Sequence, residues 1–445
     1  MTLSHLDRGG VQGADRAMHF YHRVAAPALT GSLNKMFWTT VVVQVANQEP
    51  VAGHAVLALS SLYENFSKGA QEAAPFAAWH YNEAIRLLRT TKDRALVLFV
   101  CVLFVCIELF RKNPQDAIAH YRHGINILNE MHSESDFLRN HVVPTMRQLS
   151  LVPYCYGVNP RTFPTIDRPV PSASSQFASV AEAHARQLPL HTRVARFLRI
   201  GEERRLAKGC KGPEPDRKWT RNFILLDLDS WYAAFETLKD SHQHDDKDQA
   251  VLYLLETRYL TSRIELSQSQ LESECDCDAY LDDYRHVVDL ASKVAALSAD
   301  PGSSSVKKLY PDDSAIELGF SPLLFTIVAK CRFLSVRTAA LKLMGQLARP
   351  RDNIWAKRLT LAMARRIIEI EHQISLGDMD LDGRIKDGEL PPEERRVVRL
   401  DYLSAEKRKR GPSTVITFFF RDPGSGNLIP REEWVTLEKK PSTSP

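Results

Sequence analysis

Residues 93–130 read DRALVLFVCVLFVCIELFRKNPQDAIAHYRHGINILNE, and this stretch decides the fold class. The run from Ala95 to Ile107 is apolar on every side, which is typical of a helix at the centre of a core. Asp93 stands just before the run, where its carboxylate can cap the first turn. Glu108 ends the run, which is too short to cross a bilayer. We therefore expect a buried helix here.

A second helix begins directly after it. Asn113-Pro114-Gln115-Asp116 combines a capping amide, a proline in the first turn and an acid at the positive end of the helix dipole. One face of this helix is apolar, formed by Ala117, Tyr121, Gly124, Ile125 and Leu128. The two segments predict antiparallel helices joined by a short turn.

Helical periodicity continues in both directions from this pair. No period of 33 or 34 residues holds over three copies, so a solenoid of repeats is not indicated. The pattern predicts an all-α fold, a large multi-helix domain of antiparallel helices. The further predicted helices cover residues 51–66, 76–88, 177–207, 219–240, 251–271, 280–297, 321–348 and 354–374.

The C-terminal region changes character. RRVVRLDYL (395–403) and TVITFFFRD (414–422) are rich in residues that favour strands, and they flank a polar Gly-Pro-Ser turn. This pattern predicts a small two-stranded β-ribbon near the C-terminus.

The chain divides by composition into consecutive parts. Residues 153–176 are rich in proline and serine, which favours an extended connection rather than a helix. We expect a short tail at 1–13, an N-terminal helical part at 14–152, the connection at 153–176, a C-terminal helical part of the same domain at 177–390, and the ribbon with a polar tail at 391–445.

Charge and cysteine content limit the classes of function. Lys and Arg exceed Asp and Glu by 58 to 54, too small an excess for a dedicated nucleic-acid binder. The N-terminus lacks a basic region followed by an apolar stretch, so we expect no secretion signal. The scattered, odd number of cysteines suits a reducing compartment rather than a disulfide framework. They are Cys101, Cys106, Cys155, Cys210, Cys275, Cys277 and Cys331.

Many segments, in order, resemble one known family. They include APALTG (26–31), MFWTTVVVQVANQEPVAGHAVLALSSLYENF (36–66), FAAWHYNEAIRLLR (76–89), LVLFVCVLFVCIELFRKN (96–113), FASVAEAHARQL (177–188), LDSWYAAFETL (228–238), LLFTIVAKCRFLSVRTAALKLM (323–344) and ARRIIEIE (364–371). Together they resemble the regulatory, or middle homology, domain of fungal zinc binuclear cluster transcription factors, from about Ala14 to Trp434. No segment is a catalytic signature.

The resemblance omits the DNA-binding part of that family. Its members normally begin with six cysteines that hold two zinc ions beside a basic helix, whereas the first cysteine here is Cys101, in a hydrophobic helix. The resemblance therefore implies a nuclear co-regulator without direct sequence-specific DNA binding. It would act in trans on a zinc-cluster factor, as orphan members do in secondary-metabolite gene clusters.

The expected partners are another transcription factor or a second copy, with a small apolar effector as a further possibility. No membrane association and no cofactor is expected. Two alternatives stay open: an enzyme on a helical scaffold with an unrecognised site in a core pocket, and a truncated or relic transcription factor.

Residues 378–389, DMDLDGRIKDGE, match the template of a calcium-binding loop. Asp378, Asp380 and Asp382 occupy the first ligand positions and Glu389 the last. Pro391 and Pro392 follow at once, where a calcium-binding hand needs a helix. We therefore expect no metal here.

A compact basic cluster precedes the predicted ribbon turn. Lys407, Arg408, Lys409 and Arg410 are typical of a nuclear-import signal. A solvated turn explains the same residues equally well.

Other polar residues have simpler explanations than a site. Cys275 and Cys277 lack a second Cys or His pair and suit a solvated loop, and His242 and His244 suit a flexible acidic one. His120 and His123 share a helix face with Asp116, without an evident fourth ligand. Glu108 is either a buried acid with a raised pKa or, as the simpler explanation, a residue at the rim or a partner of Arg111. No nucleophile motif or phosphate loop is present, so no catalytic residue is predicted.

Overall fold

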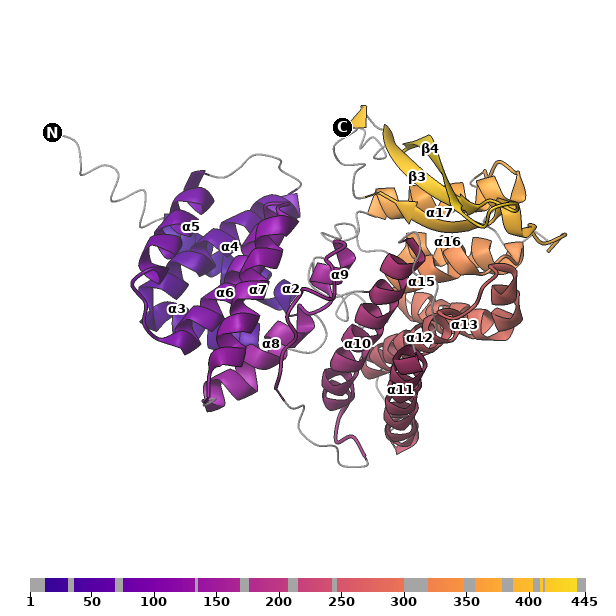
Figure 1. The fold of residues 1–445 in the computed structure, drawn as a ribbon. Coiled ribbons are helices and arrows are strands. Elements are labelled where there is room, and N and C mark those ends of the chain that lie inside the picture. The colour runs from indigo at the N-terminus through magenta and orange to yellow at the C-terminus, as the bar shows by residue number, and fades with distance from the viewer. Residues whose placement is uncertain are drawn as a thin grey trace. The chain divides into compact units, whose positions relative to one another are not determined.

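The computed structural model describes residues 13–30, 36–68, 75–132, 135–168, 176–206, 215–241, 246–299, 319–347, 357–377, 387–402, 409–410 and 413–437. These residues fall into two compact units that divide between Thr192 and Arg193. The all-α class is confirmed, together with a small antiparallel sheet near the C-terminus (Figure 1).

The first unit is a helical bundle. It contains η1 (Tyr21–Ala25), α2 (Ala26–Leu29), η2 (Phe37–Val41), α3 (Val42–Gln48), α4 (Pro50–Lys68), α5 (Pro75–Leu88), α6 (Arg94–Phe110), α7 (Pro114–Glu130), η3 (Leu138–Val142), α8 (Val143–Gln148) and α9 (Val152–Cys155). The helix α4 packs against α3, α5 and α6, and α6 packs against α7.

Helix α6 lies at the centre of this bundle, as its sequence predicts. Every residue from Leu98 to Phe110 is buried. Asp93 caps it by accepting hydrogen bonds from the backbone N–H groups of Ala95, at 2.8 Å, and Leu96, at 3.4 Å. The predicted Asn113 cap of α7 is also present, with Pro114 in the first turn.

The proline-rich stretch is less extended at its start than expected. Pro153 lies in the first turn of α9, where a proline costs no hydrogen bond because the first N–H groups of a helix lack intrahelical partners. Residues 156–168 then form turns and irregular backbone. Helix α10 (Val180–Leu206) follows and contains the border between the two units.

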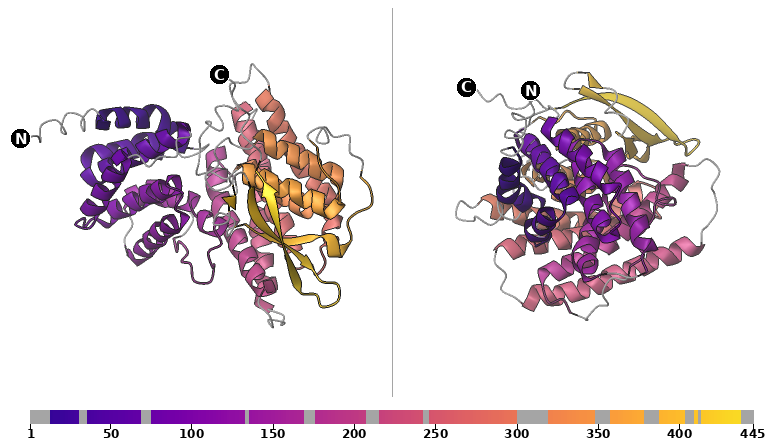
Figure 2. Two further views of the ribbon diagram at one scale, coloured as in Figure 1. Left: turned by 90° about the horizontal axis from the view of Figure 1, so that it is seen from above. Right: turned by 90° about the vertical axis from the view of Figure 1, so that its left-hand side faces the viewer.

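The second unit combines helices with the sheet. Its helices are α11 (Pro215–Ser241), α12 (Asp246–Gln268), η4 (Cys275–Tyr280), α13 (Leu281–Ala299), α15 (Phe320–Lys330), α16 (Leu334–Leu347), α17 (Lys357–His372) and η6 (Glu393–Arg395). Helix α12 packs against α11 and α13, and α15 packs against α16 and α17. Figure 2 shows the sheet lying over one side of these helices.

The sheet is larger than the predicted ribbon. Strand β3 (Ser413–Arg421) pairs with β1 (Val397–Asp401) as expected, and also with the short β2 (Lys409–Arg410). Strand β4 (Leu428–Thr436) pairs with the whole of β3, which the sequence did not indicate. Pro430 and three charged residues give β4 a poor strand pattern, which an edge strand tolerates. Gly426, with φ of 66°, lies in the turn between β3 and β4.

A buried ion cluster joins the sheet to the helices. The Glu371 carboxylate on α17 faces two guanidinium groups, Arg337 Nη1 at 2.7 Å and Arg332 Nε at 3.3 Å, and all three side chains are fully buried. The backbone N–H of Val397 in β1 donates to Glu371 at 2.6 Å. Burial alone would raise the pKa of Glu371, but the two arginines outweigh it and hold that pKa below its ordinary value.

Further pairs extend the cluster toward η4. Glu274 accepts from Lys330, at 2.8 Å, and from Arg332, at 3.0 Å. Arg396 binds both carboxylate oxygens of Asp278 at 2.9 and 2.7 Å. A two-point contact of this kind fixes the guanidinium plane, so the start of β1 is tied firmly to η4.

Candidate functional site

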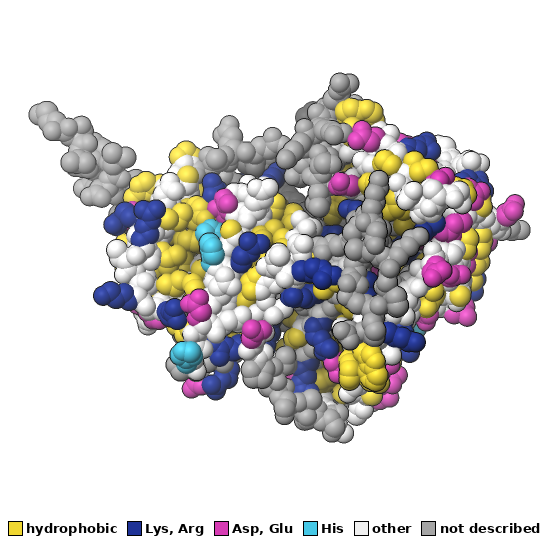
Figure 3. Space-filling model, viewed as in Figure 1, with side chains coloured by type: hydrophobic (Ala, Val, Ile, Leu, Met, Phe, Trp, Pro, Cys, Tyr) yellow, Lys and Arg dark blue, Asp and Glu magenta, His cyan; other side chains and the backbone are white. Residues whose placement is uncertain are grey.

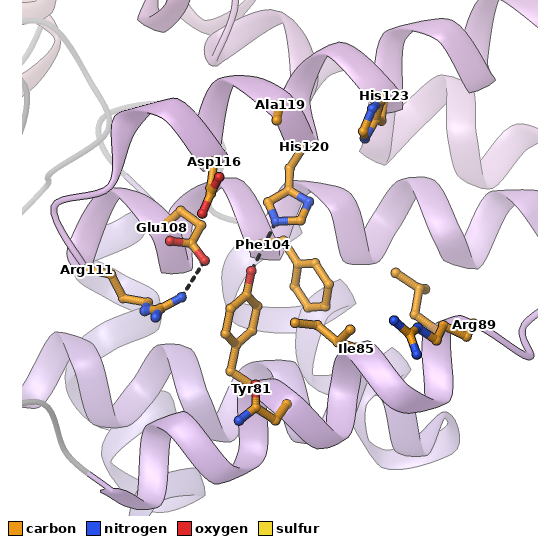
Figure 4. Close-up of a pocket in the computed structure, with 12 residues that line it drawn as sticks. Tyr81, Ile85, Arg89, Phe104, Glu108, Arg111, Asp116, Ala119, His120 and His123 are labelled. Carbon is orange, nitrogen blue, oxygen red and sulfur yellow. Dashed lines mark hydrogen bonds and ion pairs between the residues drawn. The ribbon is translucent and has the colours of Figure 1, made fainter.

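An open cleft in the first unit is the strongest candidate site. It has a volume of about 600 Å³, within the range of small-molecule sites. Helix α6 supplies Phe104 and Glu108, α5 supplies Tyr81 and Ile85, and α7 supplies His120 (Figure 4). Residues spaced by three or four positions on each helix thus line one space.

The turn between α6 and α7 forms one end of the cleft. Lys112 adopts φ of 60°, and the N–H of Asn113 donates to the Glu108 carbonyl at 2.9 Å. This arrangement is the usual C-terminal cap of a helix, with a lysine where glycine is common. The turn is short, so Glu108, Arg111 and Asp116 converge at this end.

Tyr81 and His120 form the centre of the cleft. The Tyr81 hydroxyl and His120 Nε2 are 3.0 Å apart, and both rings contact Phe104 edge-on. Burial lowers the pKa of His120, although the carboxylates of Glu108 and Asp116 act in the opposite direction. Burial, and then the nearby Glu108 carboxylate, raise the pKa of Tyr81. At neutral pH the site therefore presents a neutral imidazole and a protonated phenol.

Glu108 is buried and pairs with Arg111, as one of the expectations for it had it. Its side chain is 2% exposed, whereas that of Arg111 is 45% exposed, and Arg111 Nη1 donates to Glu108 Oε1 at 2.6 Å. The guanidinium also lies over the Tyr81 ring, 5.2 Å from its centroid. The second oxygen, Oε2, is buried without a hydrogen-bond partner among the described residues.

The histidine face of α7 does not form a metal site. His120 bonds Tyr81, and Asp116 accepts a hydrogen bond from the Asn113 side chain. Within the described ranges, no group of three or more His, Cys, Asp or Glu side chains could hold a metal ion. The cleft can bind a ligand through hydrogen bonds, charge and apolar contact.

The calcium-loop prediction falls largely outside the described residues. Asp378, Asp380 and Asp382 belong to the part that is not described, whereas Glu389 is exposed in irregular backbone. Asp387 accepts hydrogen bonds from the backbone N–H and hydroxyl of Ser335, both at 2.8 Å. After Glu389 the backbone is irregular through Pro391 and Pro392, and only the short 3₁₀ helix η6 follows, from Glu393 to Arg395.

The basic cluster is also only partly described. Lys407 and Arg408 lie outside the described residues, and Lys409 and Arg410 form β2, described for its backbone alone. The nuclear-import assignment stays a prediction. His242 and His244 likewise lie outside the described residues.

The structure corrects the prediction of a solvated loop at Cys275 and Cys277. They belong to the 3₁₀ helix η4 rather than to a solvated loop, and Cys277 is 3% exposed. The Glu393 carboxylate accepts from the N–H groups of Glu274 and Cys275, each at 3.0 Å. The sequence pattern missed this packing because Glu393 lies far away along the chain.

Helix α11 presents an apolar stripe to solvent. Trp219, Phe223 and Leu226 are 67%, 56% and 65% exposed and lie on one face at spacings of four and three. The opposite face of α11 is buried and carries Ile224, Leu228 and Trp231. Figure 3 shows apolar side chains gathered over α11. An exposed apolar patch of this kind is a candidate interaction surface.

Comparison with known proteins gives no relative: no family model, no curated protein and no solved structure matches the chain. No described helix has both the length and the apolar character needed to cross a membrane. The resemblance to zinc-cluster factors therefore rests on the sequence segments alone.

Sequence reasoning missed the main residues of both surfaces. Tyr81 and Phe104 lie in stripes that read as ordinary core positions. The α11 stripe had a usable signal, because WTRNFILL carries large apolar residues on two faces of one helix. A second apolar face on a helix is the pattern that could have indicated an interface.

Proposed function

We propose that this chain is a helical regulatory protein that acts in trans in the nucleus. It would be a co-regulator of a zinc-cluster transcription factor for a fungal secondary-metabolite gene cluster. The exposed stripe of Trp219, Phe223 and Leu226 on α11 carries the proposal, because a co-regulator must bind its partner through a surface of its own.

The stripe suits an amphipathic helix of the partner's regulatory domain. Its rings are large and rigid, with those of Trp219 and Phe223 6.1 Å apart, so binding costs little side-chain entropy. The exposed Lys218 lies toward one end of the stripe, whereas Asp227 at the other end already pairs with Arg193. A partner helix with an acidic residue near Lys218 would meet an opposite charge there.

An enzyme is the second candidate, favoured by the neutral His120 bonded to Tyr81 in the cleft. A general base works best with a pKa near the operating pH. The raised pKa of Tyr81 makes that residue a poor base, and its hydroxyl is already engaged. Ligand binding needs fewer assumptions than turnover here.

The test is co-purification of the tagged full chain with full-length zinc-cluster factors from fungal nuclei. Recovered factors would be identified by mass spectrometry, and promoter DNA would be assayed in the same sample. We expect one factor to be recovered, with promoter DNA retained only in its presence. A chain that is excluded from nuclei and recovers no factor contradicts the proposal.

Matched variants locate the surface. Trp219→Ser should reduce recovery of the factor at least about tenfold, since an aromatic residue at an interface centre contributes roughly 2 kcal/mol or more. Trp79→Ser is the control, because Trp79 on α5 is also exposed, at 60%, and lies on the other unit. Equal recovery by the two variants would remove the stripe as the contact. Self-association that depends on Trp219 would make a second copy the occupant.

A further inference from the structure

The cleft between α5, α6 and α7 offers unused binding groups, and their role as a regulatory site rests on the proposed function. Arg89, at the end of α5, is exposed and makes no ion pair with any described residue. Figure 4 shows it at the opposite end of the cleft from Glu108 and Arg111. The two ends of the cleft therefore differ. At one end the charges of Glu108 and Arg111 neutralise each other, and at the other end the charge of Arg89 is available to a ligand.

The two ring nitrogens of His120 have different surroundings. Nε2 lies 3.0 Å from the Tyr81 hydroxyl, so Tyr81 occupies that side of the ring. Nδ1 remains for a ligand, and Figure 4 shows that nitrogen facing along the cleft. An imidazole nitrogen either donates or accepts a hydrogen bond, and a hydroxyl group can do both.

An apolar floor lies between these polar groups. Phe104 is buried beneath the centre, and the side chains of Ile85 and Leu88 continue the surface toward Arg89. A ligand spanning this stretch would meet a hydrogen-bonding ring nitrogen at His120, apolar surface in the middle and a guanidinium at the end. Each feature selects a different chemical group.

We propose that this cleft binds a small hydroxylated carboxylic acid with a flat apolar body, as the effector of the regulatory protein. The carboxylate would pair with Arg89, the apolar body would lie over Phe104 and Ile85, and the hydroxyl would form a hydrogen bond with His120 Nδ1. Tyr81 is a positioning residue, since its contact with Nε2 leaves Nδ1 for the ligand. The predicted effector is thus more polar than the apolar molecule that the sequence suggested.

The test uses hydroxynaphthoic acid with the full chain, followed by fluorescence or calorimetry. Two related probes separate the groups: naphthoic acid lacks the hydroxyl, and naphthol lacks the carboxylate. We expect saturable binding of hydroxynaphthoic acid. Each related probe should bind more weakly by up to about fivefold, the range of one exposed ion pair or one hydrogen bond.

Variants assign the two ends of the ligand. Arg89→Gln should remove the advantage of hydroxynaphthoic acid over naphthol, whereas Arg86→Gln should not. Arg86 is the matched control because it is an exposed arginine on the same helix that already pairs with Glu83. His120→Phe should remove the advantage over naphthoic acid and leave the advantage over naphthol. Circular dichroism would verify that each variant is folded.

Three results would overturn the inference: no saturable binding, equal effects of the two arginine variants, or an unchanged hydroxyl preference in His120→Phe. The assay contains no transcription factor, so its outcome is independent of co-purification. Probe binding without factor recovery would leave a ligand site and refute the co-regulator. Factor recovery without probe binding would refute the ligand site alone.

Discussion

The two units use buried charge in different ways. In the second unit, Glu371 is enclosed by Arg332, Arg337 and the backbone of Val397, and all three side chains are fully buried. In the first unit, Glu108 is as deeply buried but faces a single arginine that is 45% exposed. One carboxylate is surrounded by fixed partners, and the other lies at the end of an open cleft.

This difference separates a structural cluster from a candidate binding site. A buried ion pair costs free energy to desolvate, and removing one partner costs still more because it leaves a buried charge uncompensated. The residues of the Glu371 cluster therefore cannot easily exchange partners. The Glu108 pair can reorganise because Arg111 can turn into solvent. Groups that can change partner are the ones available to a ligand, which favours the cleft over the cluster as the functional site.

The largest predicted effect comes from breaking the closed cluster. Glu371→Gln leaves two buried guanidinium groups without a full countercharge, and we expect a loss of about 3–5 kcal/mol in the free energy of unfolding. Chemical denaturation followed by circular dichroism measures this loss. Asp289→Asn on α13 is the control, because Asp289 pairs with Lys293 at the surface and should cost less than about 1 kcal/mol.

Similar losses from both variants would show that the cluster contributes no more than a surface pair. That result would remove the distinction between the two carboxylates, since Glu371 could then lose its partners at as little cost as Glu108.

The sequence was informative where a helix depends on neighbouring residues. The caps at Asp93 and Asn113, and the burial of 98–110, follow from spacing within a single segment. The pairing of β1 with β3 was also predictable, because both strands are rich in β-branched and aromatic residues.

The remaining features depend on residues that are distant along the chain. Glu371 meets Val397, Glu393 meets Cys275, and Tyr81 meets His120 across 39 positions. Hydrophobic periodicity shows on which face of a helix each residue lies, but it does not show which faces of different helices contact each other. Charged residues within apolar helices, such as Glu108, were the one local signal that a polar site lay within the bundle.

A smaller effect is expected from the cleft carboxylate. Glu108→Gln keeps a hydrogen-bond acceptor for Arg111 and lets that arginine reach solvent, so we expect a loss of about 1–2 kcal/mol in the free energy of unfolding. The same denaturation assay gives this value beside that of Glu371→Gln. A loss as large as that of Glu371→Gln would mean that the cleft is as rigidly specified as the cluster.

The smallest effect concerns pH and His372, beside the ion cluster. Burial, and then the charge of Arg337, lower the pKa of His372 to about 4, although Glu371 acts in the opposite direction. Unfolding restores a pKa near 6.5. A folded-state pKa below the unfolded value means that stability is full above about pH 6.5 and is lost as the pH falls toward 4.

Solvent screening reduces the contribution, so His372 should account for about 1 kcal/mol of the stability lost between pH 7 and 5. Denaturation of the wild type and of His372→Gln at both pH values measures it, because the variant should lose less stability by that amount. An identical pH dependence in both proteins would show that neither burial nor the charge of Arg337 lowers the pKa of His372 in the folded protein.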